Sequence, residues 1–299
     1  MGKITKLIGY LSESNYFSNY LPVFRVYISY HIIKKIYFSL SSFSLLTGDF
    51  IEGHSTLLDL TPLLLYKIGN LPVFFILMIL LTVFYGFGIG KRWTILLLAI
   101  FMYVFNNEVI ALFGNGGDNY LTFIMIYLIF TDSFEHLSFS KLDYKKKKLK
   151  KLSNFVSNLA VYSIMIHICL IYFVSFIHKI HADVWYNGVA TYYILNLERY
   201  TSPFNHLFSK NAFFIGFSTY FTLAFEMLFP LFIWNKKYRN LLLISGILLH
   251  LGIYFSMMIY DFSILFIMVY GFFLSNSEWS VILQKINQIY IKLWKVNKL

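Results

Sequence analysis

The chain has 299 residues, of which 58% are hydrophobic, 21% aromatic and only 13% charged. Soluble globular domains contain about 45–50% apolar and about 25% charged residues, so this composition excludes an ordinary soluble enzyme, a disordered chain and a fibrous repeat. Lysine and arginine outnumber aspartate and glutamate by 25 to 14, giving a net charge of +11. The basic residues lie between long apolar runs. This pattern is typical of the loops that orient a membrane protein in the bilayer, and it predicts no nucleic-acid partner.

The single cysteine, Cys169, excludes an intrachain disulfide and a metal site built from several cysteines. Its apolar neighbours Ile168 and Leu170 predict a buried, inert thiol. The first residues of the chain carry Lys3 and Lys6 and lack an apolar core, so they do not predict a cleavable signal peptide.

Eight segments of the chain are apolar enough to predict transmembrane helices, each of which needs about 20 mostly apolar residues. We therefore expect an all-α polytopic membrane protein with one domain over residues 1–299 and a membrane core over about residues 20–274. The fourth and the eighth segments are short for a span. The segments are Tyr20–Ser39, Leu71–Gly90, Trp93–Phe113, Asn119–Thr131, Phe155–Ile177, Ala212–Trp234, Leu241–Tyr260 and Phe262–Leu274.

Cations interrupt the first segment at Arg25, Lys34 and Lys35. A charge at the bilayer centre costs about 2.5–3.5 kcal/mol on insertion scales. The segment is therefore either a span whose cations face the helix bundle or an interfacial amphipathic helix.

Basic clusters follow every second segment, whereas the intervening connections carry few cations or a balance of both signs. The positive-inside rule then places both termini in the cytoplasm, and it favours counting the first segment as a span. Residues 132–151 are predicted to form a basic, solvated cytoplasmic loop near anionic lipid headgroups. In the tail, residues 276–299, apolar residues recur at helical intervals between lysines, which predicts an amphipathic helix on the inner membrane surface. The clusters are Lys91 and Arg92; Lys141, Lys145–Lys148, Lys150 and Lys151; Lys236, Lys237 and Arg239; and Lys285, Lys292, Lys295 and Lys298.

Ionisable residues inside a membrane are costly and mark candidate functional sites. In the predicted topology Glu108, Asp118 and Lys179 lie near the outer side, His250 lies near the middle of the seventh span, and Glu226 lies in the inner half of the sixth. The outer side is where a quinone, a lipid or an exported peptide would be reachable.

The turn Asn115-Gly116-Gly117-Asp118 joins the third and fourth segments. Glycines permit positive φ, and successive backbone N–H groups in such a turn can hold an anion or a carbonyl oxygen. The alternative is a plain hairpin turn between two helices, with Asp118 solvated.

Lys179 is either a lysine that extends to water at the membrane boundary or a base that apolar surroundings have made available near neutral pH. His178 and His181 have the helical spacing of metal ligands, but no third ligand is evident, so no metal site is predicted. Trp185 belongs to a predicted aromatic belt at the membrane interface.

His250 is either a neutral, hydrogen-bonded core histidine or a proton carrier that faces a cavity. Glu226, which precedes Pro230 in the sixth segment, is expected to be protonated or paired. Arg25 of the first segment is the partner we expect for it.

Several motifs follow one another along the chain: Asn115 to Asp118, Lys179 six residues before Trp185, Gly188, Glu226 with Pro230, Arg239 and His250. This ordered set resembles the horizontally transferred transmembrane domain. This is the membrane part that vitamin K-dependent gamma-carboxylase shares with many bacterial proteins. The resemblance covers roughly Tyr20 to Leu274, and within that family the chain is most similar to the sporulation-delaying protein B family.

The resemblance implies a multi-pass protein of a bacterial cell membrane that helps to produce or export a secreted antimicrobial peptide, together with the peptide precursor and a small accessory protein. It implies that Lys179 takes the place of the lysine that deprotonates vitamin K hydroquinone in the carboxylase, and that His250 assists proton handling. A quinone cofactor follows from the resemblance alone. One more residue separates the lysine from the tryptophan here than in the carboxylase.

Three functional hypotheses follow. The first is maturation or export of the peptide, with Lys179 as a base at an outer cavity that Asp118 and its glycine turn line. The second is an immunity protein or passive transporter without chemistry. The third is a quinone-linked enzyme of the carboxylase or oxidoreductase kind. We see no nucleotide-binding loop and no inverted repeat that would favour active transport.

Overall fold

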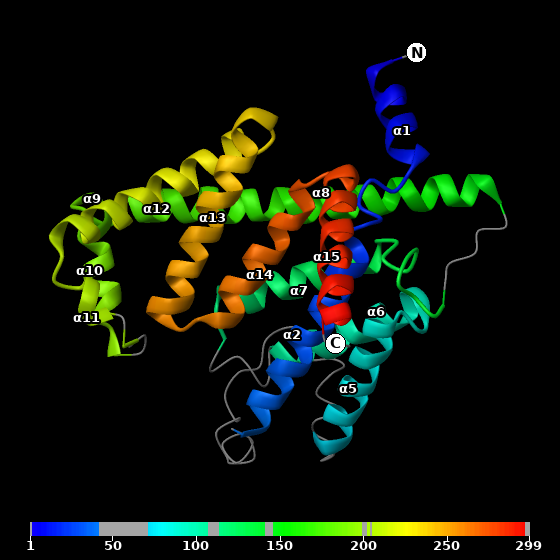
Figure 1. The fold of residues 1–299 in the computed structure, drawn as a ribbon, viewed down its shortest axis with the longest axis horizontal. Coiled ribbons are helices and arrows are strands. Elements are labelled where there is room, and N and C mark those ends of the chain that lie inside the picture. Colours follow the sequence, from blue (N-terminus) through cyan, green and yellow to red (C-terminus); the bar gives the residue numbers. More distant parts are fainter. Residues whose placement is uncertain are drawn as a thin grey trace, which may run out of the picture. The chain divides into compact units, whose positions relative to one another are not determined.

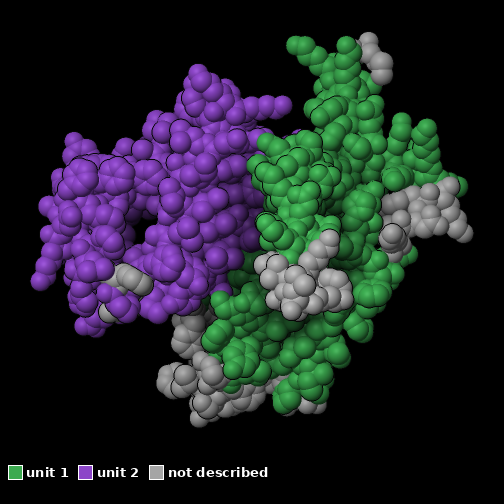
Figure 2. Space-filling view, viewed as in Figure 1, with its two compact units in different colours: residues 1–161, 274–299 green, residues 162–273 purple. Residues whose placement is uncertain are grey.

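A computed structural model describes residues 2–41, 71–106, 114–140, 146–198, 202–203 and 205–296. Over these residues the chain is helical and contains no β-strand, which confirms the predicted all-α class (Figure 1). The chain divides into two compact units: residues 1–161 with 274–299 form unit 1, and residues 162–273 form unit 2 (Figure 2).

Unit 1 contains a series of helices in which α2 packs against α5, α5 against α6, and α6 against α7. The first part of the long helix α8 and the C-terminal helix α15 complete this unit. Its elements are α1 (Lys3–Glu13), α2 (Leu21–Ser41), α5 (Leu71–Phe87), α6 (Lys91–Val104), α7 (Gly116–Ile129), the start of α8 (Lys147–Ile180) and α15 (Asn276–Val296).

Unit 2 is built on the second part of α8. Helix α13 packs against α12 on one side and α14 on the other, and α10 contacts α12 and α13 (Figure 1). Its remaining elements are α9 (Asp183–Tyr186), α10 (Ala190–Leu195), α11 (Asn205–Phe208), α12 (Ala212–Phe232), α13 (Lys236–Met257), α14 (Tyr260–Tyr270) and the 3-10 helix η4 (Gly271–Phe273).

All eight predicted segments coincide with helices where the structure describes them, and residues 107–113 of the third lie outside the described residues. The helices differ in length and charge. Helices α8, α12 and α13 are long and apolar enough to cross a membrane. A fourth candidate arises only when Tyr260–Phe273 and Asn276–Lys292 are taken together as one bent pair. Helix α5 is apolar but has 17 residues, and α6 and α7 have 14 each. Within the described part of the chain, length and composition therefore support three membrane helices, or four if the bent pair is one span.

Helix α2 buries charge and exposes apolar surface. Arg25 is fully buried and Lys35 is 8% exposed, whereas Val26, Tyr30 and Ile33 are 49%, 64% and 39% exposed. A helix in water shows the reverse arrangement. This distribution agrees with the first alternative above, in which the cations of the segment face the bundle; Lys34, at intermediate exposure, is the exception.

The predicted loop over residues 132–151 is only partly solvated. Asp132, Ser133 and Phe134 are buried, and α8 begins at Lys147. These first residues are therefore not the solvated linker that we expected, because they bond within unit 1. The carbonyl oxygen of Ser133 accepts from the buried guanidinium of Arg25, and the N–H of Asp132 donates to the Ser157 hydroxyl at 2.9 Å.

Unit 1 also contains the first and the last helix of the described chain, α1 and α15. In the predicted tail, residues 276–296 form the helix α15, and Trp279 of this helix stacks on Tyr20 with ring centroids 4.3 Å apart. The N-terminal helix α1 was not predicted. The side chain of Asn158 on α8 binds the C-terminal end of α1, donating to the carbonyl oxygens of Leu11 in its last turn and of Ser14, its C-cap, both at 2.8 Å.

Candidate functional sites

The predicted site residues form two clusters, one within each unit. Glu108, also singled out by sequence, lies outside the described residues. The unit 1 cluster contains Arg25, Asn115, Gly116, Gly117 and Asp118, and the unit 2 cluster contains Lys179, Trp185, Glu226 and His250.

The glycine turn begins helix α7 rather than forming an open loop. Asn115 is the N-cap: its side-chain oxygen accepts from the N–H of Gly117 at 2.8 Å, and a carboxylate oxygen of Asp118 accepts from the N–H of Asn115 at 2.9 Å. Gly116 and Gly117 are helical, and neither has positive φ. The positive φ that these glycines would permit is therefore not used, because the capping side chains stabilise a helix start at this point.

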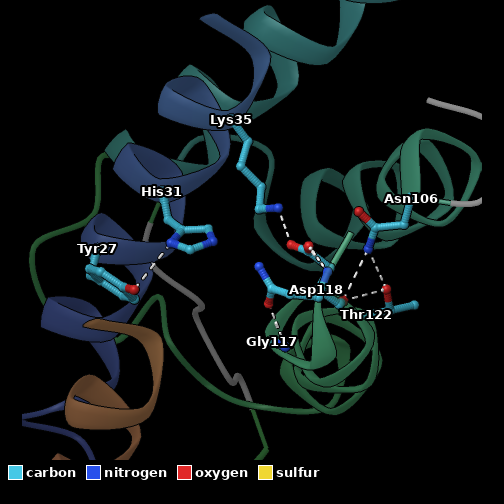
Figure 3. A network of polar contacts seen from close by, with 8 residues as sticks. Tyr27, His31, Lys35, Asn106, Gly117, Asp118 and Thr122 are labelled. Atoms are coloured by element: carbon cyan, nitrogen blue, oxygen red, sulfur yellow. Dashed lines mark hydrogen bonds and ion pairs between the residues drawn. The ribbon is translucent and has the colours of Figure 1, made fainter. Parts of the chain in front are cut away.

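The second carboxylate oxygen of Asp118 forms a buried ion pair with the ammonium of Lys35 (Figure 3). Asn106 approaches from the other side, where its amide donates to the backbone carbonyl of Asp118 at 3.1 Å and to the hydroxyl of Thr122 at 2.5 Å. The simpler alternative expected Asp118 to be solvated, whereas in the structure its side chain is buried. Each buried charge here has a partner of opposite sign, as a low-dielectric interior requires.

The polar residues of α2 follow one face of the helix. Tyr27, His31 and Lys35 are spaced four residues apart, and the Tyr27 hydroxyl lies 3.1 Å from Nδ1 of His31 (Figure 3). The guanidinium of Arg25 lies 5.3 Å from the ring centroid of Phe134 and donates to carbonyl oxygens of unit 1. We expected Arg25 to pair with the carboxylate of Glu226, but in the structure it bonds to these carbonyl oxygens instead.

In unit 2 the partner of Glu226 is Lys179. The ammonium of Lys179, at the end of α8, pairs with Oε1 of Glu226 on α12, and the Ser175 hydroxyl donates to the same oxygen at 3.1 Å. The ammonium also lies 4.8 Å from the ring centroid of Trp185. The side chain of Lys179 is 24% exposed. It therefore ends on a carboxylate and an aromatic face rather than extending into water.

A second polar group lies one to two turns earlier on α8. The Tyr172 hydroxyl bonds to Nε2 of His250 on α13 at 2.8 Å and to the hydroxyl of Tyr270 on α14. Tyr172, Ser175 and Lys179 have the spacing i, i+3, i+7, which places them on one helix face. This face of α8 thus meets polar side chains from α12, α13 and α14.

Sequence reasoning missed Tyr172, Ser175 and Tyr270, although the spacing from Lys179 could have identified the first two. Two buried atoms of the cluster have no hydrogen-bond partner within the described chain: Oε2 of Glu226 and Nδ1 of His250. Pro230 has no N–H to bond the carbonyl of Glu226, so α12 is locally weakened beside the carboxylate.

Such a cluster can hold and move a proton. Its members are an amine, a carboxylate, an imidazole and two phenols, drawn from four helices. His178 and His181 are exposed, and no group of three or more His, Cys, Asp or Glu side chains able to hold a metal ion occurs among the described residues.

Comparisons of the chain with protein-family models, with curated proteins and with solved structures find no match.

Proposed function

We propose that this chain is a multi-pass protein of a bacterial cell membrane that matures or exports a secreted antimicrobial peptide by proton transfer at the Lys179–Glu226 pair. The observation that carries the chemistry is the pair itself, in which the carboxylate is buried and the Lys179 side chain is 24% exposed. Ser175 joins it on the same face of α8, which also carries Tyr172, the partner of His250. The peptide, its precursor, the small accessory protein and a quinone cofactor rest on the family resemblance.

The proposed reaction begins with a proton transfer inside the pair. In a low-dielectric site the neutral amine and carboxylic acid compete with the ion pair, because burial penalises both charges. When the proton moves from Nζ of Lys179 to Oε1 of Glu226, the free amine can accept a proton from a substrate. Ser175 holds the orientation of Oε1 during this exchange.

We propose that α2 and the shorter helices also cross the membrane, giving about eight spans with both termini in the cytoplasm. The inward cations and outward apolar residues of α2 support this for the first segment. The positive-inside rule supports the sidedness, because exposed lysines occupy the first turn of α8.

The sidedness can be tested with a thiol reagent that does not cross membranes, in a Cys169→Ala background. Asn187 and Lys146 are both exposed. Asn187→Cys should react in intact cells, and Lys146→Cys should react only after the membrane is permeabilised. The opposite pattern would reject the orientation.

The chemistry can be tested by mass spectrometry of the secreted peptide. Lys179→Arg retains an ion pair with Glu226 but cannot release a proton, because arginine stays charged in proteins. We expect loss of processed peptide with Lys179→Arg, Lys179→Ala and Glu226→Gln, and normal peptide with Lys210→Ala, an exposed lysine of the same unit.

The second candidate function is a passive role in immunity or transport, without chemistry. The ion pair between α8 and α12 is compatible with this role if it only holds the two helices together. In that case Lys179→Arg would leave the peptide unchanged in mass and amount, while Lys179→Ala would lower the amount of folded protein. Protection of a naive host by this gene alone would identify immunity.

A further inference from the structure

Unit 1 contains a groove between α2 and α5 that none of the predicted site residues lines. Its volume is about 640 Å³, within the ~300–1,000 Å³ of typical small-molecule sites. Helix α2 contributes Val26 and Ile33, α5 contributes Val83 and Phe87, and the segment before α8 contributes Phe139.

Small residues form the floor of the groove, where the two helices pack closely. Gly86 has no side chain, and a Cβ atom placed on it would lie 3.1 Å from both Cβ and Oγ of Ser29. The two backbones therefore approach one another here without a gap. The larger side chains Val26, Ile33, Val83 and Phe87 also line the groove.

The groove offers almost no hydrogen bonds to a ligand. The hydroxyls of Ser29, Thr82 and Ser138 donate to the backbone carbonyls of their own unit, at 3.1, 2.6 and 2.7 Å. Apart from Tyr30 the rest of the lining is apolar. A peptide placed here would leave its backbone N–H and C=O groups unsatisfied, whereas a hydrocarbon chain has none to satisfy.

One end of the groove has the features of a membrane interface. The N–H of Phe139 donates to the carbonyl of Phe87 at 3.2 Å, which brings this segment to the end of α5. Four residues further, α6 begins with the exposed cation Lys91, and Trp93 is 73% exposed. Exposed tryptophan and lysine are typical of the headgroup level of a bilayer.

We infer that this groove binds one acyl chain of an anionic membrane phospholipid, with the phosphate beside Lys91. The inference rests on the membrane embedding of α2 and α5 in the proposed function, but not on the chemistry at Lys179. The charge of Lys91 matches the headgroup, and the apolar groove matches the chain.

The test uses the full chain in vesicles of phosphatidylglycerol and phosphatidylcholine, with a photoreactive diazirine on the acyl chain of either lipid. Cross-linked peptides are mapped by mass spectrometry. Cross-links should concentrate on Val26–Ile33 and Val83–Phe87, with phosphatidylglycerol preferred. Val83→Trp should lower them by roughly tenfold because it fills the groove, and Lys91→Gln should lower the preference for phosphatidylglycerol about fivefold.

Leu80→Trp is the matched control, because Leu80 is an exposed residue of α5 that does not line the groove. It should leave the cross-links at Val83–Phe87 unchanged. Equal labelling of Val73, Ile76 and the groove residues, unaffected by Val83→Trp, would overturn the inference by showing ordinary contact with surrounding lipid. Absence of cross-links on every face of α5 would overturn it together with the proposed span, while leaving the assay of secreted peptide untouched.

Discussion

The ammonium of Lys35 on α2 donates to the carboxylate of Asp118 in the first turn of α7, and both side chains are buried. The same carboxylate caps α7 through the N–H of Asn115. One aspartate therefore stabilises a helix start and fixes the position of a helix 83 residues earlier in the chain. Removal of the charge of Lys35 or Asp118 should therefore affect more than the contact between these two side chains.

Lys35→Met and Asp118→Asn should each destabilise the protein by about 3–5 kcal/mol, because each leaves the opposite charge buried without a partner. The double variant should be more stable than either single variant, since it removes both charges. Thermal unfolding in detergent measures the three differences. A double variant whose loss equals the sum of the single losses would contradict the ion pair.

Gly246→Ala should destabilise unit 2 by about 1–3 kcal/mol through overpacking. A Cβ atom on Gly246 would lie 2.8 Å from ring atoms of Phe225 and Tyr270, so α13 would have to move. Gly252, six residues later on the same helix, has no atom within 4 Å of the corresponding position. Gly252→Ala should be neutral or stabilise the protein by up to about 1 kcal/mol, because alanine favours a helix more than glycine does. A loss as large as that of Gly246→Ala would argue against close packing at Gly246.

Tyr172→Phe should cost more stability than Tyr270→Phe. The Tyr172 hydroxyl bonds to both His250 and Tyr270, so its removal leaves two buried polar groups unsatisfied. Each unsatisfied group costs about 1–3 kcal/mol. Tyr270→Phe breaks one bond and leaves the bond between Tyr172 and His250. Chemical unfolding compares the two variants, and an equal or reversed order would show that Tyr172 is not the centre of the network.

Asn158→Leu should release the chain around α1. Its side chain makes three bonds of 2.8–3.0 Å, two to the carbonyls of Leu11 and Ser14 and one from the N–H of Tyr16. Amide hydrogen exchange over residues 3–16 should accelerate, because the last of these bonds protects the Tyr16 amide directly. Asn154 is the control, since its bonds to this segment are 3.4 Å long. Faster exchange in Asn154→Leu than in Asn158→Leu would contradict this account.

The sequence was sufficient to locate the long apolar helices, but not α1, α9, α10 and α11. Apolar length and helical spacing are local properties, and the eight predicted segments and the tail coincide with helices wherever the structure describes them. It was less successful at the glycine turn, where Asn115 and Asp118 form a capping box that begins α7 and neither Gly116 nor Gly117 has the positive φ that glycine permits. The predicted burial of Cys169 is confirmed.

The number of spans and the topology stay predictions, because charge and length alone do not decide whether α2 and the shorter helices cross the membrane. The burial of Arg25 and Lys35 is a tertiary property that residue types along the chain did not decide. Both cations are tolerated because unit 1 supplies their acceptors, one of them from a segment that the sequence analysis placed in solvent.

By itself the sequence determined that the chain is helical, apolar and equipped with a few costly ionisable residues, among them Lys179, Glu226, His250 and Asp118. Only the tertiary structure decided their partners: Lys179 for Glu226, Tyr172 for His250, and Lys35 for Asp118. The physical reason is that a helical pattern is set by neighbours three or four residues away. The partner of a buried charge is instead set by which helix faces pack together, across separations of 47 to 83 residues.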